Sequence, residues 1–265
     1  MMDGTACVTG NAPWQWDDVV LDLGMQLADL AHQTDVDVLR SVADIETTHA
    51  TGGVGLVFGL EAATPIGNDL DKLDVLYGLG IRQIGIAYFD SNALGSGLNE
   101  VVDGGLTALV RRAVRRMNQL GLAVDVSHSS DRTGIDTCAA SDRPVFITHA
   151  GARAVWDIPR LKGDDVLRAV AGTGGVIGID AVGFGPDSLY GDHVGLHTAF
   201  AGLLSTEPRP GAPVPERVPY VDGLENPTEC FANIAAWLVR DGFTDEEITK
   251  VLGGNVLRAL RAIWV

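Results

Sequence analysis

Short apolar segments alternate with amphipathic helical segments from residue 52 onward, and this alternation most constrains the fold. Predicted strands cover 52–61, 81–88, 122–127, 144–148 and 175–179. Predicted helices cover 68–80, 104–121, 131–141 and 164–174, with three more at 227–242, 244–253 and 255–264. Because parallel strands need long crossovers, the pattern predicts an α/β fold whose parallel sheet is covered by helices. A (β/α)8 TIM-type barrel is the favoured closure, and an open doubly wound sheet is the alternative.

Composition and charge indicate the class of protein. The 265 residues are 46% hydrophobic, which suits one domain spanning residues 1–265. Nineteen basic and 35 acidic residues give a net charge of -16, which argues against nucleic acid and anionic membranes as partners. The three cysteines form no CxxC pair, and the N-terminus shows no signal-peptide pattern. We therefore expect a soluble cytoplasmic protein.

Polar residues that suit a catalytic site lie at or just beyond the predicted strand ends: Glu61, Tyr88, His128, His149 and Asp187. In parallel α/β folds, the carboxyl ends of the strands form the ligand-binding face. A single histidine there is usually satisfied by the backbone, but two histidines and a carboxylate are the usual ligands of a catalytic divalent metal. Two simpler interpretations stay open: Glu61 pairs with Arg82, or Asp187 closes a turn.

Five segments together resemble the membrane (renal) dipeptidase family of zinc peptidases, within the amidohydrolase-type barrels. They are "GLEAATPIGNDLDKLDVLYGLGIRQIGIAY", "MNQLGLAVDVSHSSDRT", "RPVFITHAGARAVWDIPR", "DDVLRAVAGTGGVIGI" and "GFTDEEITKVLGGNVLRAL". The resemblance implies that Glu61, His128 and His149 bind metal. It also implies that Arg160 grips the substrate carboxylate, as a bidentate guanidinium can. Asp187 matches the aspartate that handles the proton of the attacking water.

The chain departs from this family at several positions. The family has a His-x-Asp pair at the end of its first strand, where this chain has Thr5 and Cys7. We therefore expect one bound Zn²⁺ rather than two. Tyr88 stands in place of a histidine that stabilises the tetrahedral intermediate, and a phenol can donate the same hydrogen bond. Only two residues separate 175–179 from the next apolar run, so we expect an interrupted or shortened barrel.

These features lead to three functional hypotheses. The first is a metal-dependent hydrolase that cleaves a dipeptide or related amide, with Asp187 as general base. The alternative is a catalytically degenerate relative that binds a small carboxylate ligand without hydrolysing it. A third keeps the metal but opens a cyclic amide or lactam. The resemblance also implies that two copies of the chain form a homodimer. The molecule bound at the site is expected to be a small substrate that carries a carboxylate.

Overall fold

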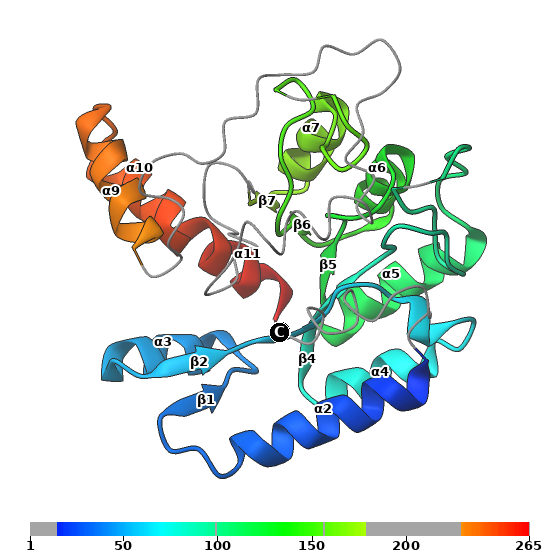
Figure 1. The fold of residues 1–265 in the computed structure, drawn as a ribbon, viewed down its shortest axis with the longest axis horizontal. Helices are drawn as coiled ribbons and strands as arrows, with labels where there is room; N and C mark the ends of the chain where they lie inside the picture. The colour runs from blue at the N-terminus through cyan, green and yellow to red at the C-terminus, as the bar shows by residue number, and fades with distance from the viewer. Residues whose placement is uncertain (1–14, 99, 156, 179–228, 265) are drawn as a thin grey trace, which may run out of the picture.

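The computed structural model describes residues 15–98, 100–155, 157–178 and 229–264. Its elements run along the chain as shown in Figure 1. In order they are α2 (Trp16–Leu30), β1 (Val36–Val38), α3 (Val42–Thr51), β2 (Val54–Leu56), β3 (Phe58–Leu60), η1 (Thr64–Ile66), α4 (Asp71–Gly78), β4 (Ile81–Gly85), α5 (Ala108–Leu120), β5 (Ala123–Asp125), α6 (Asp131–Ala140), β6 (Val145–Ile147), α7 (Asp164–Gly172), β7 (Val176–Ile177), α9 (Cys230–Arg240), α10 (Asp245–Thr249), η2 (Lys250–Gly254) and α11 (Asn255–Ile263).

The described strands form two parallel sheets. One has five strands in the order β3-β4-β5-β6-β7, and the other pairs β1 with β2. In the chain, one α-helix lies between each pair of successive strands of the larger sheet, in the order α4, α5, α6 and α7. Each of these helices packs on the next (Figure 1). The strands follow sequence order across the larger sheet, as in a (β/α) barrel wall rather than a doubly wound sheet. Within the described ranges the two sheets stay separate, and the predicted interruption after 175–179 lies outside the described residues.

The predicted single strand over 52–61 is wrong, because the apolar run changes partner at Val57. Its first half, β2, pairs with β1, and its second half, β3, pairs with β4. Val54 and Leu56 are 58% and 42% exposed, whereas Phe58 and Leu60 are each 4% exposed. An apolar run shows that a segment suits a strand but does not identify the strand that it pairs with. Only the buried half leads to the site.

Helix α5 shows how local sequence determines an element. The Thr107 side chain accepts a hydrogen bond from the Val110 backbone N–H at the helix start, and Gly121 ends the helix with φ +79°. Between these caps, the apolar side chains lie on the side facing the core, where Val114 and Met117 are fully buried. The predicted helix over 104–121 is therefore confirmed, with a start four residues later.

The two faces of the larger sheet pack against different helices. Because successive side chains in a strand point to opposite faces, Val124 and Ala123 lie on opposite sides of β5. Val124 belongs to the main apolar core, together with Val114 and Met117 of α5. Ala123 and Phe146 instead pack against Ala259, Leu260 and Ile263 of α11. The C-terminal helix α11 therefore covers part of the sheet face that, in a closed barrel, packs against side chains of the other strands.

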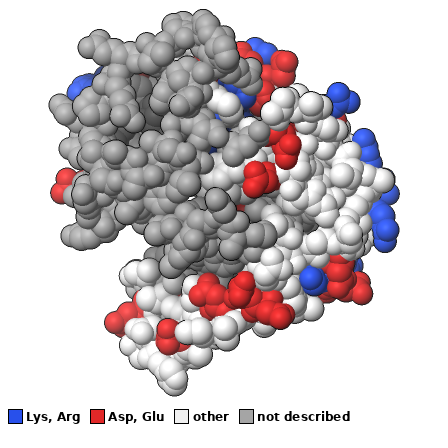
Figure 2. Space-filling model, turned by 45° about the vertical axis from the view of Figure 1, so that its right-hand side comes forward, with Lys and Arg blue, Asp and Glu red and all other residues white. Residues whose placement is uncertain are grey.

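The outer surface agrees with the acidic composition. In Figure 2, acidic side chains gather over the lower part of the described surface, and basic side chains lie mostly along its right-hand edge. Among the described residues, no helix is both long enough and apolar enough to traverse a bilayer.

Candidate metal centre

Three predicted ligands meet at the carboxyl ends of the larger sheet. Glu61 directly follows β3, His128 lies in the turn after β5, and His149 lies two residues past β6. Glu61 Oε1 is 2.8 Å from His128 Nε2 and 3.5 Å from His149 Nε2. The two imidazole Nε2 atoms are 2.8 Å apart. These three side chains are the one group of potential metal ligands found among the described residues, with ligand atoms within 4.8 Å of one another.

Burial and charge set the protonation of this group. Burial by itself raises the pKa of Glu61, but hydrogen bonds and charge from His128 and His149 outweigh it and hold that pKa below its ordinary value. Burial, followed by the nearby positive charge of Arg160, lowers the pKa of His128 to about 3, against the opposing effect of Glu61. A carboxylate beside a neutral imidazole is the protonation state in which both side chains can coordinate a cation.

The spacing and chemistry of the three donors fit a divalent cation. Zinc bonds of about 2.0–2.1 Å in tetrahedral geometry place neighbouring ligand atoms about 3.3 Å apart. The observed separations of 2.8, 2.8 and 3.5 Å lie near this value. A cation at this position would be reached by lone pairs from both Nε2 atoms and from the carboxylate oxygen.

Tyr88 and Arg160 also lie at this centre. The Tyr88 ring packs on the His128 imidazole, with ring centroids 4.2 Å apart and planes inclined by 39°. Arg160 Nη2 donates a hydrogen bond to the backbone carbonyl of His149 at 3.1 Å, and the residue is 9% exposed. The structure therefore brings five predicted site residues together. Asp187 and the predicted departures at Thr5 and Cys7 lie outside the described residues.

The alternative pairing of Glu61 with Arg82 is wrong. The Arg82 guanidinium donates to the backbone carbonyls of Arg40, Tyr77 and Ile81, at 2.8–2.9 Å. It also lies over the Tyr77 ring, 4.0 Å from the centroid. These contacts use Arg82 to join β4 to its neighbouring segments, so Glu61 is left to the two histidines.

Sequence reasoning missed the polar residues that surround the ligands. Asp125 and Ser127 precede His128 in "DVSH", Thr148 precedes His149 in "ITH", and Lys162 Nζ donates to the Ser129 carbonyl. All four are buried or partly buried, and Lys162 is only 1% exposed. For Asp125, Ser127 and Thr148 the signal was their polarity at buried strand ends, where a polar side chain needs a partner; Lys162, just before α7, carried no such signal.

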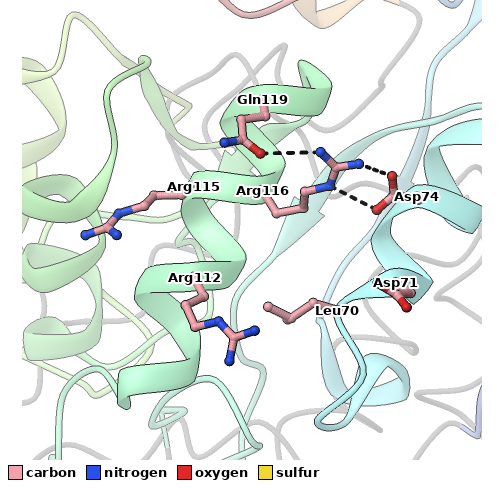
Figure 3. A pocket seen from close by; sticks show the side chains of 7 residues that line it. All are labelled: Leu70, Asp71, Asp74, Arg112, Arg115, Arg116 and Gln119. Carbon is pink, nitrogen blue, oxygen red and sulfur yellow. Dashed lines mark hydrogen bonds and ion pairs between the residues drawn. The ribbon is translucent and has the colours of Figure 1, made fainter.

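A groove of about 310 Å³ lies apart from these ligands, between α4 and α5 (Figure 3). In it, the Arg116 guanidinium faces the Asp74 carboxylate and also reaches Gln119. Its lining residues are Leu70, Asp71, Asp74, Arg112, Arg115, Arg116 and Gln119. None of them belongs to the metal centre, so this groove is a surface feature of the outer helices.

Comparison with known proteins places this geometry in context. The family model described as Membrane dipeptidase (Peptidase family M19) matches residues 21–188, which is more than half of the chain. Dipeptidase tcpJ of Claviceps purpurea (strain 20.1) is 27% identical over 266 residues, covering 92% of this chain. The chain spans only 57% of the length of that dipeptidase.

Two solved structures are similar to the whole fold. An amidohydrolase from Pseudomonas aeruginosa is 23% identical with a TM-score of 0.75, covering 95% of this chain and 86% of its own. A metallo peptidase from Rhodobacter sphaeroides, liganded with a phosphinate mimic of the dipeptide L-Ala-D-Ala, is 24% identical with a TM-score of 0.72. That match covers 94% of this chain and 75% of the peptidase. The likeness confirms the predicted barrel-type α/β fold.

Proposed function

This chain belongs to the membrane dipeptidase family, peptidase family M19, and from that premise we propose that it is a metal-dependent hydrolase of dipeptides or related amides. The observation that carries the proposal is the convergence of Glu61, His128 and His149 within 4.8 Å at the strand ends. The dipeptidase named among its relatives and the dipeptide mimic bound by a similar peptidase support the same substrate class.

The proposed cofactor is one Zn²⁺ ion held by Glu61, His128 and His149. A divalent cation in such a site supplies an activated water whose pKa falls towards about 7. Nitrogen and carboxylate donors with one position left open suit this ion. A single zinc ion, a homodimer, one domain over 1–265 and a cytoplasmic location remain predictions.

The chain's own residues would bind and orient the substrate. Arg160 offers a guanidinium that can pair with a substrate carboxylate, and its bond to the His149 carbonyl fixes it beside the ligands. Tyr88 lies against His128, from where its phenol can donate a hydrogen bond to the oxyanion of the cleaved amide. Asp187 would accept the proton of the attacking water.

The competing hypothesis of a degenerate relative that binds a carboxylate without hydrolysis is less well supported. That hypothesis requires a metal centre that has lost its ligands. Glu61, His128 and His149 are instead all present and in contact with one another. Opening of a cyclic amide would use the same centre, so only the substrate distinguishes it from dipeptide cleavage.

Metal analysis combined with activity assays tests the proposal. The purified chain is stripped with a chelator, reloaded with zinc, and assayed on a panel of dipeptides beside cyclic amides. We expect about one zinc per chain and hydrolysis that His128→Ala abolishes. His49→Ala, at an exposed histidine of α3, is the control that keeps full activity. Less than about half an equivalent of any divalent metal, with no zinc-dependent turnover, would contradict the proposal.

A further inference from the structure

Asp125 is a buried carboxylate that lies beside the metal centre without belonging to its ligand group. It is 2% exposed at the end of β5. Its Oδ1 accepts hydrogen bonds from the Ser127 hydroxyl at 2.6 Å and from the backbone N–H groups of Ser127 and Thr148. Its Oδ2 accepts from the Thr148 hydroxyl at 2.6 Å and from Gln83 Nε2 at 3.2 Å. Five donors therefore hold this side chain in place.

These bonds determine the direction of the next hydrogen bond. The Ser127 and Thr148 hydroxyls both donate to the Asp125 carboxylate oxygens, so the single hydroxyl proton of each points to Asp125. Thr148 Oγ1 lies 2.9 Å from His149 Nδ1 and has no second proton to donate. His149 Nδ1 must therefore be the donor, and in the neutral ring Nε2 then carries a lone pair. That lone pair is on the atom 3.5 Å from Glu61 Oε1.

The other ligand histidine is oriented differently. Among the described residues, His128 Nδ1 is buried without a hydrogen-bond partner. Its ring is instead packed between aromatic neighbours, with the Tyr88 centroid at 4.2 Å and the Phe89 centroid at 5.9 Å. Packing limits how the ring lies but does not select which nitrogen carries the proton.

We propose that Asp125 and Thr148 are positioning residues that act through His149. They hold its ring as the Nδ1–H tautomer and aim Nε2 at the cation position. We call the chain of hydrogen bonds from Asp125 through Thr148 to His149 the relay. It rests on the proposed metal-dependent function, because its purpose is to present a lone pair to the ion. Carboxylates that orient metal-binding histidines usually do so directly, whereas here the hydroxyl of Thr148 carries the bond between them.

Variants at Thr148 test the relay through zinc affinity. Thr148→Val keeps the side-chain shape but removes the hydroxyl, and we expect zinc to bind about 10- to 100-fold more weakly. Thr148→Ser keeps the hydroxyl and should bind zinc within about threefold of the original chain. Thr137→Val is the matched control, since this buried hydroxyl has no hydrogen-bond partner within the described residues, and its zinc affinity should not change. Equal zinc affinity in the Val and Ser variants at 148 would overturn the proposal.

The histidine tautomer gives a second measurement that needs neither zinc nor activity. Nitrogen-15 NMR of the metal-free chain distinguishes the two ring nitrogens of each of its six histidines, and His149→Ala assigns the signal. We expect His149 to be the Nδ1–H form in the original chain, and an Nε2–H signal would overturn the relay. If the chain binds no zinc but shows the expected tautomer, the proposed function and the metal role of the relay fail, while the orientation of His149 by Asp125 and Thr148 stands. If zinc binds normally with the wrong tautomer, the relay fails while the function stands.

Discussion

Gly85 lies against the backbone of Glu61, and replacing it with alanine should displace that ligand. A Cβ built on Gly85 would lie 1.8 Å from the Glu61 carbonyl oxygen and 2.8 Å from the carbonyl carbon. Raising the 1.8 Å contact to 3.0 Å, the lower limit of real Cβ contacts, requires a shift of about 1.2 Å between the two backbones. Metal sites tolerate deviations of only about 0.2 Å in ligand distance. Gly85→Ala should therefore weaken zinc binding at least tenfold.

Two matched glycines separate the effect on the site from the effect on stability. A Cβ on Gly175 would lie 1.9 Å from the Val145 carbonyl oxygen, at the end of the strands opposite to the ligands. Gly175→Ala should thus destabilise the chain by about 1–3 kcal/mol, as Gly85→Ala should, but keep its zinc affinity. Gly78→Ala in α4, where a Cβ meets nothing within 4 Å, should leave both properties intact.

Chelator competition measures the zinc affinity of each variant, and urea unfolding measures its stability. The reasoning predicts that only Gly85→Ala loses zinc binding beyond its loss of stability. If Gly85→Ala bound zinc as tightly as the original chain, the argument that close backbone packing positions Glu61 would be refuted. If Gly175→Ala lost zinc binding equally, the effect would belong to the sheet as a whole.

Two further predictions concern stability. Burial lowers the pKa of Lys162 from 10.5 to about 7. Between these two pH values the unfolded chain holds a proton that the folded chain lacks. The free energy of unfolding should therefore rise by about 1.4 kcal/mol for each pH unit. Urea unfolding measured from pH 7.5 to 9.5 should show that this rise is smaller in Lys162→Met but unchanged in the exposed Lys250→Met. The same pH dependence of the unfolding free energy in both variants would contradict the prediction. On α5, Met117→Ala should lower the unfolding free energy by about 2–5 kcal/mol, because this side chain is fully buried. The exposed Arg112→Ala should change it by less than about 0.5 kcal/mol. Similar losses in both variants would disprove the assigned buried face of the helix.

The sequence by itself determined the elements whose signals are local. Thr107 and Gly121 delimit α5 because capping and a positive φ depend on neighbours within a few residues. It also identified Glu61, His128 and His149, because the carboxyl ends of parallel strands share one face. The family resemblance, which the matched region 21–188 bears out, supplied the same three residues.

Only the tertiary structure decided which groups meet across the sheet. The strand pairings that divide 52–61 at Val57, the bond of Arg82 to the Arg40 carbonyl and the bond of Thr148 to Asp125 each join segments that are far apart in the sequence. Strand pairing and buried hydrogen bonds depend on the partner that packing brings near. A residue's own sequence neighbourhood carries no record of that partner, so these contacts could be found only in the folded chain.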